Sequence, residues 1–373
     1  MINMNITVLS IHSCYCQKIG IGKSGGLSIY LYNLVDFLLS KKVKVNFITS
    51  YHENCLLEKN VNLNIIHSKN SKLSDSQIFS VSNKTDLLIS NYWTSGMFAK
   101  KFFNSSKIKK INISHTIEGL KKVNSPTYQI DKFRYEEEKM FSDFFDYVIC
   151  FSKQEKELLK KDYGYLESQI LDSTPGYNQN FFYNMSKQYS REYINFHQKD
   201  ELILFVGRLD YLKGLDIALD VMRLSKIKSK NYKLLIAGGD RGSLEQKKII
   251  EELKMNKIND SIFWLGSLSQ KDLNYYYNAV DIVLIPSRSE TFGMVCLEAI
   301  ATKTPVLASP VGRMKDFIDN GNSGILVEKN TSQEYFSNLE MFFENKDFYK
   351  PNLEKVGTFQ WNRVLSKTFD IFI

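Results

Sequence analysis

The stretch SETFGMVCLE, residues 289–298, is the most informative part of this chain. It follows an apolar run at Asp281–Ile285, which is typical of a buried strand, and it leads into a helical pattern over Met294–Ala301. A strand that ends in a loop and opens a helix presents free backbone N–H groups at the positive end of the helix dipole. Glu290 precedes this helix start, and Glu298 lies farther along the same helix.

These residue types suit a ligand that carries both negative charge and hydroxyl groups, such as a nucleotide sugar. Carboxylates accept hydrogen bonds from neighbouring hydroxyls, and the N–H groups of Phe292, Gly293 and Met294 can bind sugar hydroxyls or phosphate oxygens. Gly293 has no Cβ, so its backbone can approach a ligand closely. The alternative is one glutamate favoured by the helix dipole and a second glutamate on a solvated face.

A second motif, FVGRLDYLKG at residues 205–214, favours the functional interpretation. The apolar run Leu202–Val206 predicts a buried parallel strand, and Asp216–Leu224 predicts an amphipathic helix. The loop between them carries Arg208 and Lys213, and such a loop faces the ligand crevice of an open α/β sheet. Two cations there can clamp a diphosphate, whereas the alternative is two solvated loop cations.

Strand and helix patterns alternate along the rest of the chain, which predicts parallel sheets with helices on both faces. A polar stretch at Asn178–Asp200 separates two sets of strands, so we predict two doubly wound domains, residues 1–177 and residues 178–357. The remaining apolar runs expected to be strands are Asn5–Ile11, Val45–Ile48, Leu87–Ser90, Ile111–Ser114, Tyr147–Phe151, Lys233–Ala237, Ile262–Leu265 and Val306–Ala308.

A glycine-rich turn, GIGKSGG at residues 20–26, stands between the first strand and a helical pattern at Leu27–Leu39. Backbone amides of such a turn can cradle phosphate or sugar oxygens. The turn matches neither a Walker loop nor the spaced dinucleotide fingerprint, and a glycine pair by itself most often marks a simple turn.

Composition bounds the class of protein. A chain of 373 residues with 43% hydrophobic and 24% charged residues is typical of a two-domain globular protein. It has no apolar run of membrane-spanning length, and its first residues do not look like a signal peptide. The five cysteines form neither a disulfide framework nor a zinc pattern, which predicts a reducing cytoplasm.

The net charge is +8, and lysine pairs recur in the N-terminal half. Solvated faces explain most such clusters, and the functional alternative is peripheral contact with anionic lipids at the inner face of the membrane. The sequence has no RRM, KH or helix-turn-helix signature, so we expect no nucleic-acid partner.

The two motifs, in this order, resemble the retaining glycosyltransferases of family 4, which have the GT-B fold. Further matches resemble the branch of inositol-phosphate glycosyltransferases and sucrose-phosphate synthases; they are Ser24–Leu27, Asn91–Gly96, Ser114–Thr116 with Lys121, and Pro175–Asn178 with Phe181. The resemblance implies an α/β GT-B architecture, with two Rossmann-like domains facing across a cleft. It also implies that a terminal helix at residues 358–373 returns to the N-terminal domain.

The resemblance implies transfer of a sugar, with retention, from a nucleoside-diphosphate sugar to a hydroxyl acceptor, without a metal ion or a cofactor. The sequence contains no Asp-x-Asp motif, in keeping with that expectation. The catalytic residues that it implies are His115, Arg208, Lys213 and Glu290. The donor-binding residues that it implies are Gly26, Gly207, Phe292, Gly293, Met294, Val295 and Glu298.

On the acceptor side, the resemblance implies a sugar, a polyol phosphate or a glycan. The branch holds a phosphorylated acceptor with residue types that correspond here to Lys72, Tyr92, Thr116 and Arg134. Two alternatives remain open: a GT-B sugar epimerase or phosphorylase, and a catalytically silent nucleotide-sugar-binding protein.

Overall fold

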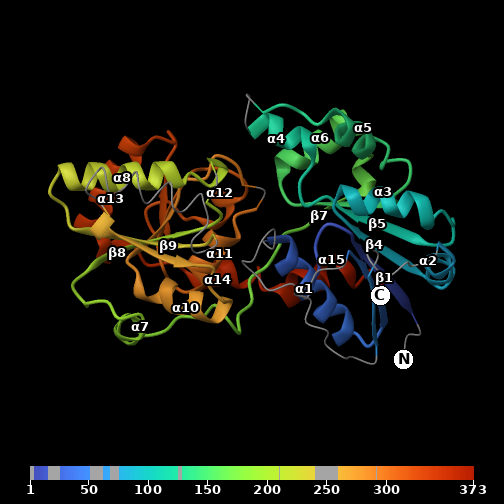
Figure 1. The fold of residues 1–373 in the computed structure, drawn as a ribbon, viewed down its shortest axis with the longest axis horizontal. Helices are drawn as coiled ribbons and strands as arrows, with labels where there is room; N and C mark the ends of the chain where they lie inside the picture. The colour runs from blue at the N-terminus through green and yellow to red at the C-terminus, as the bar shows by residue number, and fades with distance from the viewer. Residues whose placement is uncertain are drawn as a thin grey trace. The chain divides into compact units, whose positions relative to one another are not determined.

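The chain folds into two compact units, shown in Figure 1. The computed structural model describes residues 4–15, 26–50, 62–67, 75–124, 128–209, 211–239, 259–290 and 292–373. The first unit holds the described residues up to Pro175 together with Trp361–Ile373, and the second holds Gly176–Gln360. Lys72 and the glycine-rich turn up to Gly25 lie outside the described residues.

The first unit is built on a seven-stranded sheet in the order β3-β2-β1-β4-β5-β6-β7, and every pairing is parallel. The strand order reverses between β1 and β4, and this is where ligands bind in open α/β sheets. The strands are β1 (Asn5–Ser10), β2 (Lys44–Thr49), β3 (Leu63–His67), β4 (Leu87–Asn91), β5 (Lys109–Ile113), β6 (Tyr147–Cys150) and β7 (Ile170–Asp172).

Helices cover both faces of this sheet, with α1 and α15 on one face and α3 on the other (Figure 1). The terminal helix joins the first unit through the Trp361 ring, whose centroid lies 5.4 Å from that of Tyr30, and through a 2.7 Å hydrogen bond between the Ser173 and Thr368 hydroxyls. The helices are α1 (Gly26–Ser40), α2 (Asp75–Ser82), α3 (Trp93–Phe102), α4 (Glu118–Asn124), α5 (Lys132–Lys139), α6 (Lys153–Asp162) and α15 (Trp361–Phe369).

The second unit is a six-stranded parallel sheet in the order β10-β9-β8-β11-β12-β13, and its order reverses between β8 and β11. Its strands are β8 (Glu201–Val206), β9 (Tyr232–Ala237), β10 (Ile262–Gly266), β11 (Ile282–Ile285), β12 (Val306–Ala308) and β13 (Gly324–Leu326). Helices α8 and α13 cover one face and α10 the other (Figure 1). The helices are α7 (Lys187–Tyr193), α8 (Leu215–Ile227), α10 (Gln270–Ala279), α11 (Met294–Ala301), α12 (Met314–Phe317), α13 (Ser332–Glu344) and α14 (Leu353–Gly357).

The predicted fold class of two doubly wound parallel sheets is confirmed. The sequence patterns missed three strands, β3, β7 and β13, and each of them lies at an edge of its sheet. An edge strand pairs on one side only, so it needs neither the length nor the continuous apolar run of a central parallel strand. Among the described residues, no helix combines the length and the apolar character needed to cross a bilayer.

Candidate active site

In the second unit, glycines allow the loops at the carboxyl ends of neighbouring strands to approach each other closely. Gly214, which ends the loop after β8, has φ 72°, and a Cβ there would lie 2.0 Å from the Pro286 carbonyl oxygen after β11. Gly238 follows β9 with φ 131°, and a Cβ there would lie 1.9 Å from the carbonyl oxygen of Gly207. Only glycine fits such positions, so these residues set the spacing of the loops.

This packing brings together a lysine of the first motif and a glutamate of the second. The Nζ atom of Lys213 lies 2.5 Å from Oε1 of Glu290, and the Ser287 hydroxyl donates to the same oxygen at 3.2 Å. The side chains are only 22% and 14% exposed, so the pair sits partly shielded from water. Arg208 lies in the same loop as Lys213, and its side chain is exposed.

A residue that the sequence analysis did not single out, Arg288, ties the two loops together. Its guanidinium forms a bidentate ion pair with Asp216, at 2.7 and 2.6 Å, and its Cζ lies 3.8 Å from the centre of the Tyr211 ring. Its backbone N–H also donates to the Leu212 carbonyl at 2.8 Å. The only signal in the sequence is that Arg288 adjoins the decisive stretch, because its pairing with Asp216 requires the folded chain.

The first turn of α11 has the geometry that the sequence predicts for a helix start. Gly293 is its N-cap with φ 98°, and a Cβ there would lie 2.9 Å from the Met314 side chain. Phe292 is buried against Phe317, with ring centroids 5.2 Å apart, so the turn is anchored. The N–H groups of Met294 and Val295 open the helix, where no preceding turn supplies acceptors.

Glu298 lies inside the second unit. Its side chain is 6% exposed and accepts a 2.9 Å hydrogen bond from the buried Tyr277 hydroxyl. Burial raises the pKa of Glu298 to about 8. Its contact with ribose hydroxyls stays a prediction.

In the first unit, His115 lies just after β5 and beside Asn91, the last residue of β4. His115 Nε2 and Asn91 Oδ1 are 3.0 Å apart, and the Tyr30 ring packs edge-on against the imidazole with centroids 5.1 Å apart. Burial, together with repulsion from His12, lowers the pKa of His115 to about 3, so the imidazole is neutral. His115 and Tyr92 both have positive φ, 56° and 73°, and such strain concentrates at functional sites.

Three of the four predicted acceptor residues are in contact. The Arg134 guanidinium donates to the Tyr92 hydroxyl at 2.9 Å, to the Thr116 carbonyl at 2.6 Å and, through Nε, to Glu138 at 2.6 Å. Arg134 is only 3% exposed, so in this structure its N–H groups serve other parts of the protein. The fourth residue, Lys72, lies outside the described residues. Gly26, predicted on the donor side, is the exposed first residue of α1.

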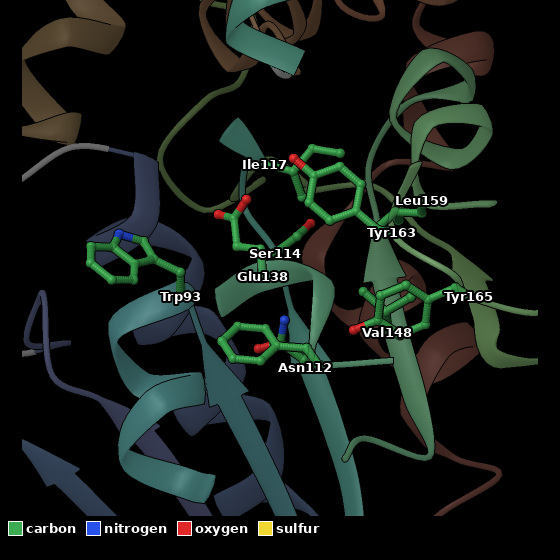
Figure 2. A pocket seen from close by; sticks show the side chains of 10 residues that line it. Trp93, Asn112, Ser114, Ile117, Glu138, Val148, Leu159, Tyr163 and Tyr165 are labelled. Carbon is green, nitrogen blue, oxygen red and sulfur yellow. The ribbon is translucent and has the colours of Figure 1, made fainter. Parts of the chain in front are cut away.

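A small pocket in the first unit is bordered by Asn112, Ser114, Glu138 and Tyr163 among others (Figure 2). Its volume of about 10 Å³ has room for roughly one water molecule, so it cannot hold a sugar. The Asn112 side-chain oxygen is buried and has no hydrogen-bond partner among the described residues, which suits such a water. Within the residues that the structure describes, no group of three or more His, Cys, Asp or Glu side chains could hold a metal ion.

Comparisons with known proteins find glycosyltransferases among the similar sequences. Residues 186–355 match the family model described as glycosyl transferases group 1. The chain is 26% identical to the D-inositol 3-phosphate glycosyltransferase of Corynebacterium urealyticum, over 92% of this chain and 88% of that protein. It is 27% identical to the protein of the same name from Corynebacterium kroppenstedtii, over 92% of this chain and 82% of that protein.

Solved structures share the fold over nearly the whole chain. Sucrose-phosphate synthase from Thermosynechococcus elongatus superposes with a TM-score of 0.87 at 22% identity, covering 99% of this chain and 98% of that one. Alr3699/HepE of Anabaena, solved in complex with UDP and glucose, superposes with a TM-score of 0.74 at 17% identity, covering 99% and 96%.

Proposed function

We propose that the chain, which has the GT-B fold and a glycosyl transferases group 1 domain, is a glycosyltransferase that moves a sugar from a nucleoside-diphosphate sugar to a hydroxyl acceptor. The observation that carries this proposal is the contact of Lys213 with Glu290 in front of the α11 helix start. The cation and the open amides match the negatively charged diphosphate of the donor, and the carboxylate matches its sugar hydroxyls.

The diphosphate is the leaving group, and its negative charge grows as the bond to the sugar breaks. Lys213, Arg208 and the N–H groups of Met294 and Val295 stabilise that charge, and preorganised donors of this kind supply much of the rate enhancement in enzymes. Glu290 keeps Lys213 oriented before the donor arrives. When Lys213 pairs with the diphosphate in place of Glu290, the carboxylate of Glu290 accepts hydrogen bonds from the sugar hydroxyls.

The transfer breaks the bond between the anomeric carbon and the diphosphate oxygen and forms a bond from that carbon to the acceptor oxygen. We propose that the new bond forms on the same face, with retention, and that the acceptor's proton passes to the departing phosphate oxygen. The reaction proposed here needs neither a metal ion nor a cofactor. A neutral His115 can hydrogen-bond to the sugar, because burial keeps it uncharged.

The acceptor proposed for this site is a sugar, a polyol phosphate or a glycan. Support comes from the Tyr92, Thr116 and Arg134 cluster and from relatives whose names specify an inositol phosphate. We further propose that the enzyme works in the cytoplasm, where the lysine-rich N-terminal half can contact anionic lipid.

A screen of nucleotide sugars tests the proposed function. The chain is incubated with each sugar of a UDP, GDP and ADP panel, and released nucleoside diphosphate is measured by mass spectrometry. We expect release from at least one donor, stimulated by an acceptor extract and lost in Lys213→Ala. Release of a free sugar isomer would indicate an epimerase instead. Stabilisation by a nucleotide without any release would indicate a silent binding protein.

A further inference from the structure

Glu118, the first residue of α4, holds its carboxylate inside a cage of donors in the predicted acceptor cluster. Its Oε2 lies 2.9 Å from Lys121 Nζ and 3.1 Å from Arg134 Nη1. Its Oε1 accepts hydrogen bonds from the Tyr128 hydroxyl at 2.7 Å and from the Asp131 backbone N–H at 3.0 Å. The Glu118 side chain is 0% exposed, so its carboxylate is fully enclosed by the protein.

Two cations, a hydroxyl and an amide N–H are the groups with which proteins bind phosphate monoesters. Here a carboxylate of the chain itself already occupies their centre. The hydrogen bonds from Asp131, Tyr128 and Lys121 outweigh the effect of burial and lower the pKa of Glu118, so the carboxylate is ionised at neutral pH. The cage is therefore filled by an anion.

The other N–H donors of Arg134 also have partners within the protein, so they do not offer a second place for a phosphate to bind. Its Nε pairs with Glu138 at 2.6 Å, its Nη2 donates to the Thr116 carbonyl at 2.6 Å, and its Nη1 also donates to the Tyr92 hydroxyl. The cluster thus sets two cationic side chains, Arg134 and Lys121, against two carboxyl groups, Glu118 and Glu138. Among the described residues of this cluster, an incoming phosphate would meet no unbalanced positive charge, and it would have to displace Glu118.

We propose that Glu118 fills the anion position of the acceptor site, so that the acceptor presents hydroxyl groups there and not a phosphate monoester. This inference rests on the proposed function and narrows its acceptor to a neutral sugar, polyol or glycan end. Glu118 is then a specificity-determining residue, because its carboxylate repels the group that the neighbouring cations would otherwise attract. Neutral hydroxyls remain compatible with the Tyr92 hydroxyl and with the partly exposed Lys121.

Inorganic phosphate is the probe that tests this cage directly, without knowledge of the acceptor. The melting temperature is measured against phosphate concentration for the wild type, Glu118→Ala and Glu136→Ala. Glu136 lies on α5 with a 65% exposed side chain, so its loss is a matched change of charge outside the cage. Phosphate bound elsewhere, including the loops proposed to hold the donor, affects all three proteins alike.

The expected result is a gain in phosphate response in Glu118→Ala alone. That variant leaves Arg134 and Lys121 without their anion, and phosphate at ten times its Kd should then raise the melting temperature by about 3 °C more than in the wild type. A wild type that responds as strongly as Glu118→Ala would overturn the proposal, and so would a Glu118→Ala variant that responds no more than the wild type.

Removal of a buried carboxylate from two cations can itself prevent folding. If Glu118→Ala does not fold, a comparison of the wild type with Lys121→Ala tests the proposal instead. Lys121 is 31% exposed, so its replacement should be tolerated. The wild type and Lys121→Ala should respond equally to phosphate, whereas a smaller response in Lys121→Ala would mean that the wild-type cage admits phosphate, contrary to the inference. These titrations involve no sugar donor, so their outcome is separate from that of the nucleotide-sugar screen.

Discussion

Lys213 Nζ and Glu290 Oε1 are 2.5 Å apart although 77 residues of chain separate them. The two residues come from loops at the carboxyl ends of β8 and β11, neighbouring strands on either side of the point where the strand order of the second unit reverses. Backbone approach at Gly214 and the Arg288–Asp216 ion pair hold those loops together. A charged pair is thus kept in place before any ligand arrives.

Replacement of Lys213 by alanine should reduce catalysis far more than stability. Loss of one preorganised donor to the leaving group costs about 3 kcal/mol of transition-state stabilisation, or roughly 10²-fold in kcat/KM. A partly exposed ion pair contributes no more than about 1 kcal/mol to folding. The measurement is nucleoside-diphosphate release alongside the melting temperature. The control is Lys315→Ala, which removes a 61% exposed lysine of the same unit; equal losses in both variants would argue against the role of Lys213.

His115 should stay neutral throughout the physiological pH range. Its pKa is lowered to about 3, so the folded protein resists its protonation while an unfolded chain takes up the proton near pH 6.5. This residue therefore lowers stability as pH falls from about 6.5 towards 3. Imidazole NMR resonances should show no titration of His115 between pH 5 and 8, in contrast to the same protein in denaturant. A midpoint near 6.5 in the folded protein would contradict the buried geometry.

Glu155 should make the first unit less stable as pH rises from about 4.5 to about 7. This fully buried carboxyl accepts from the Ser114 hydroxyl at 2.7 Å and the Phe151 N–H at 2.9 Å, and burial raises its pKa to about 7. Between about pH 4.5 and 7 the folded chain keeps a proton that the unfolded chain releases, so stability falls across that window.

Glu155→Gln should remove that pH dependence. The gain in unfolding free energy of the variant over the wild type should be larger at pH 8 than at pH 5, by at most about 3 kcal/mol. Chemical denaturation at the two pH values measures it, and Glu157→Gln, on the same helix with a 70% exposed side chain, is the control. Parallel pH profiles for the wild type and Glu155→Gln would refute the raised pKa.

Gly214→Ala should damage both folding and catalysis. A methyl group there would collide with the Pro286 carbonyl in a left-handed backbone conformation, at a strain cost of about 1–3 kcal/mol before the collision is counted. Relief of the clash moves Lys213 away from Glu290, so kcat/KM should fall with the melting temperature. Gly357→Ala is the matched control, because a Cβ at that position meets nothing within 4 Å. If Gly214→Ala behaved like Gly357→Ala, the close loop approach would not be required.

The repeating strands and the helix starts could be predicted because they depend on local features of the chain. Apolar runs such as Leu202–Val206 and the glycine before Met294 specify a buried strand and a helix entry by themselves. The edge strands β3, β7 and β13 could not be predicted in this way. Their pairing depends on a neighbour already being in the sheet, which a short window of sequence does not reveal.

The candidate site likewise contains residues that the sequence predicted and residues that it did not. Residue types and loop positions pointed to Lys213, Glu290 and the α11 start as one group, and the structure brings Lys213 and Glu290 into contact. The sequence did not predict Arg288 and Glu118 as site residues, because neither belongs to a local sequence motif. Arg134, which the resemblance places among the acceptor residues, pairs in the structure with Glu118 and Glu138, and its contact with an acceptor stays a prediction.

The amino-acid order alone thus determined all the strands except β3, β7 and β13, the glycines that open the loops and the charged residues that stand at strand ends. Tertiary structure alone decided the partner and the ionisation of each charged group. The physical reason is that strand and helix formation depends on near neighbours in the chain, whereas the energy of a charge depends on the water removed around it and on atoms that only the fold brings near.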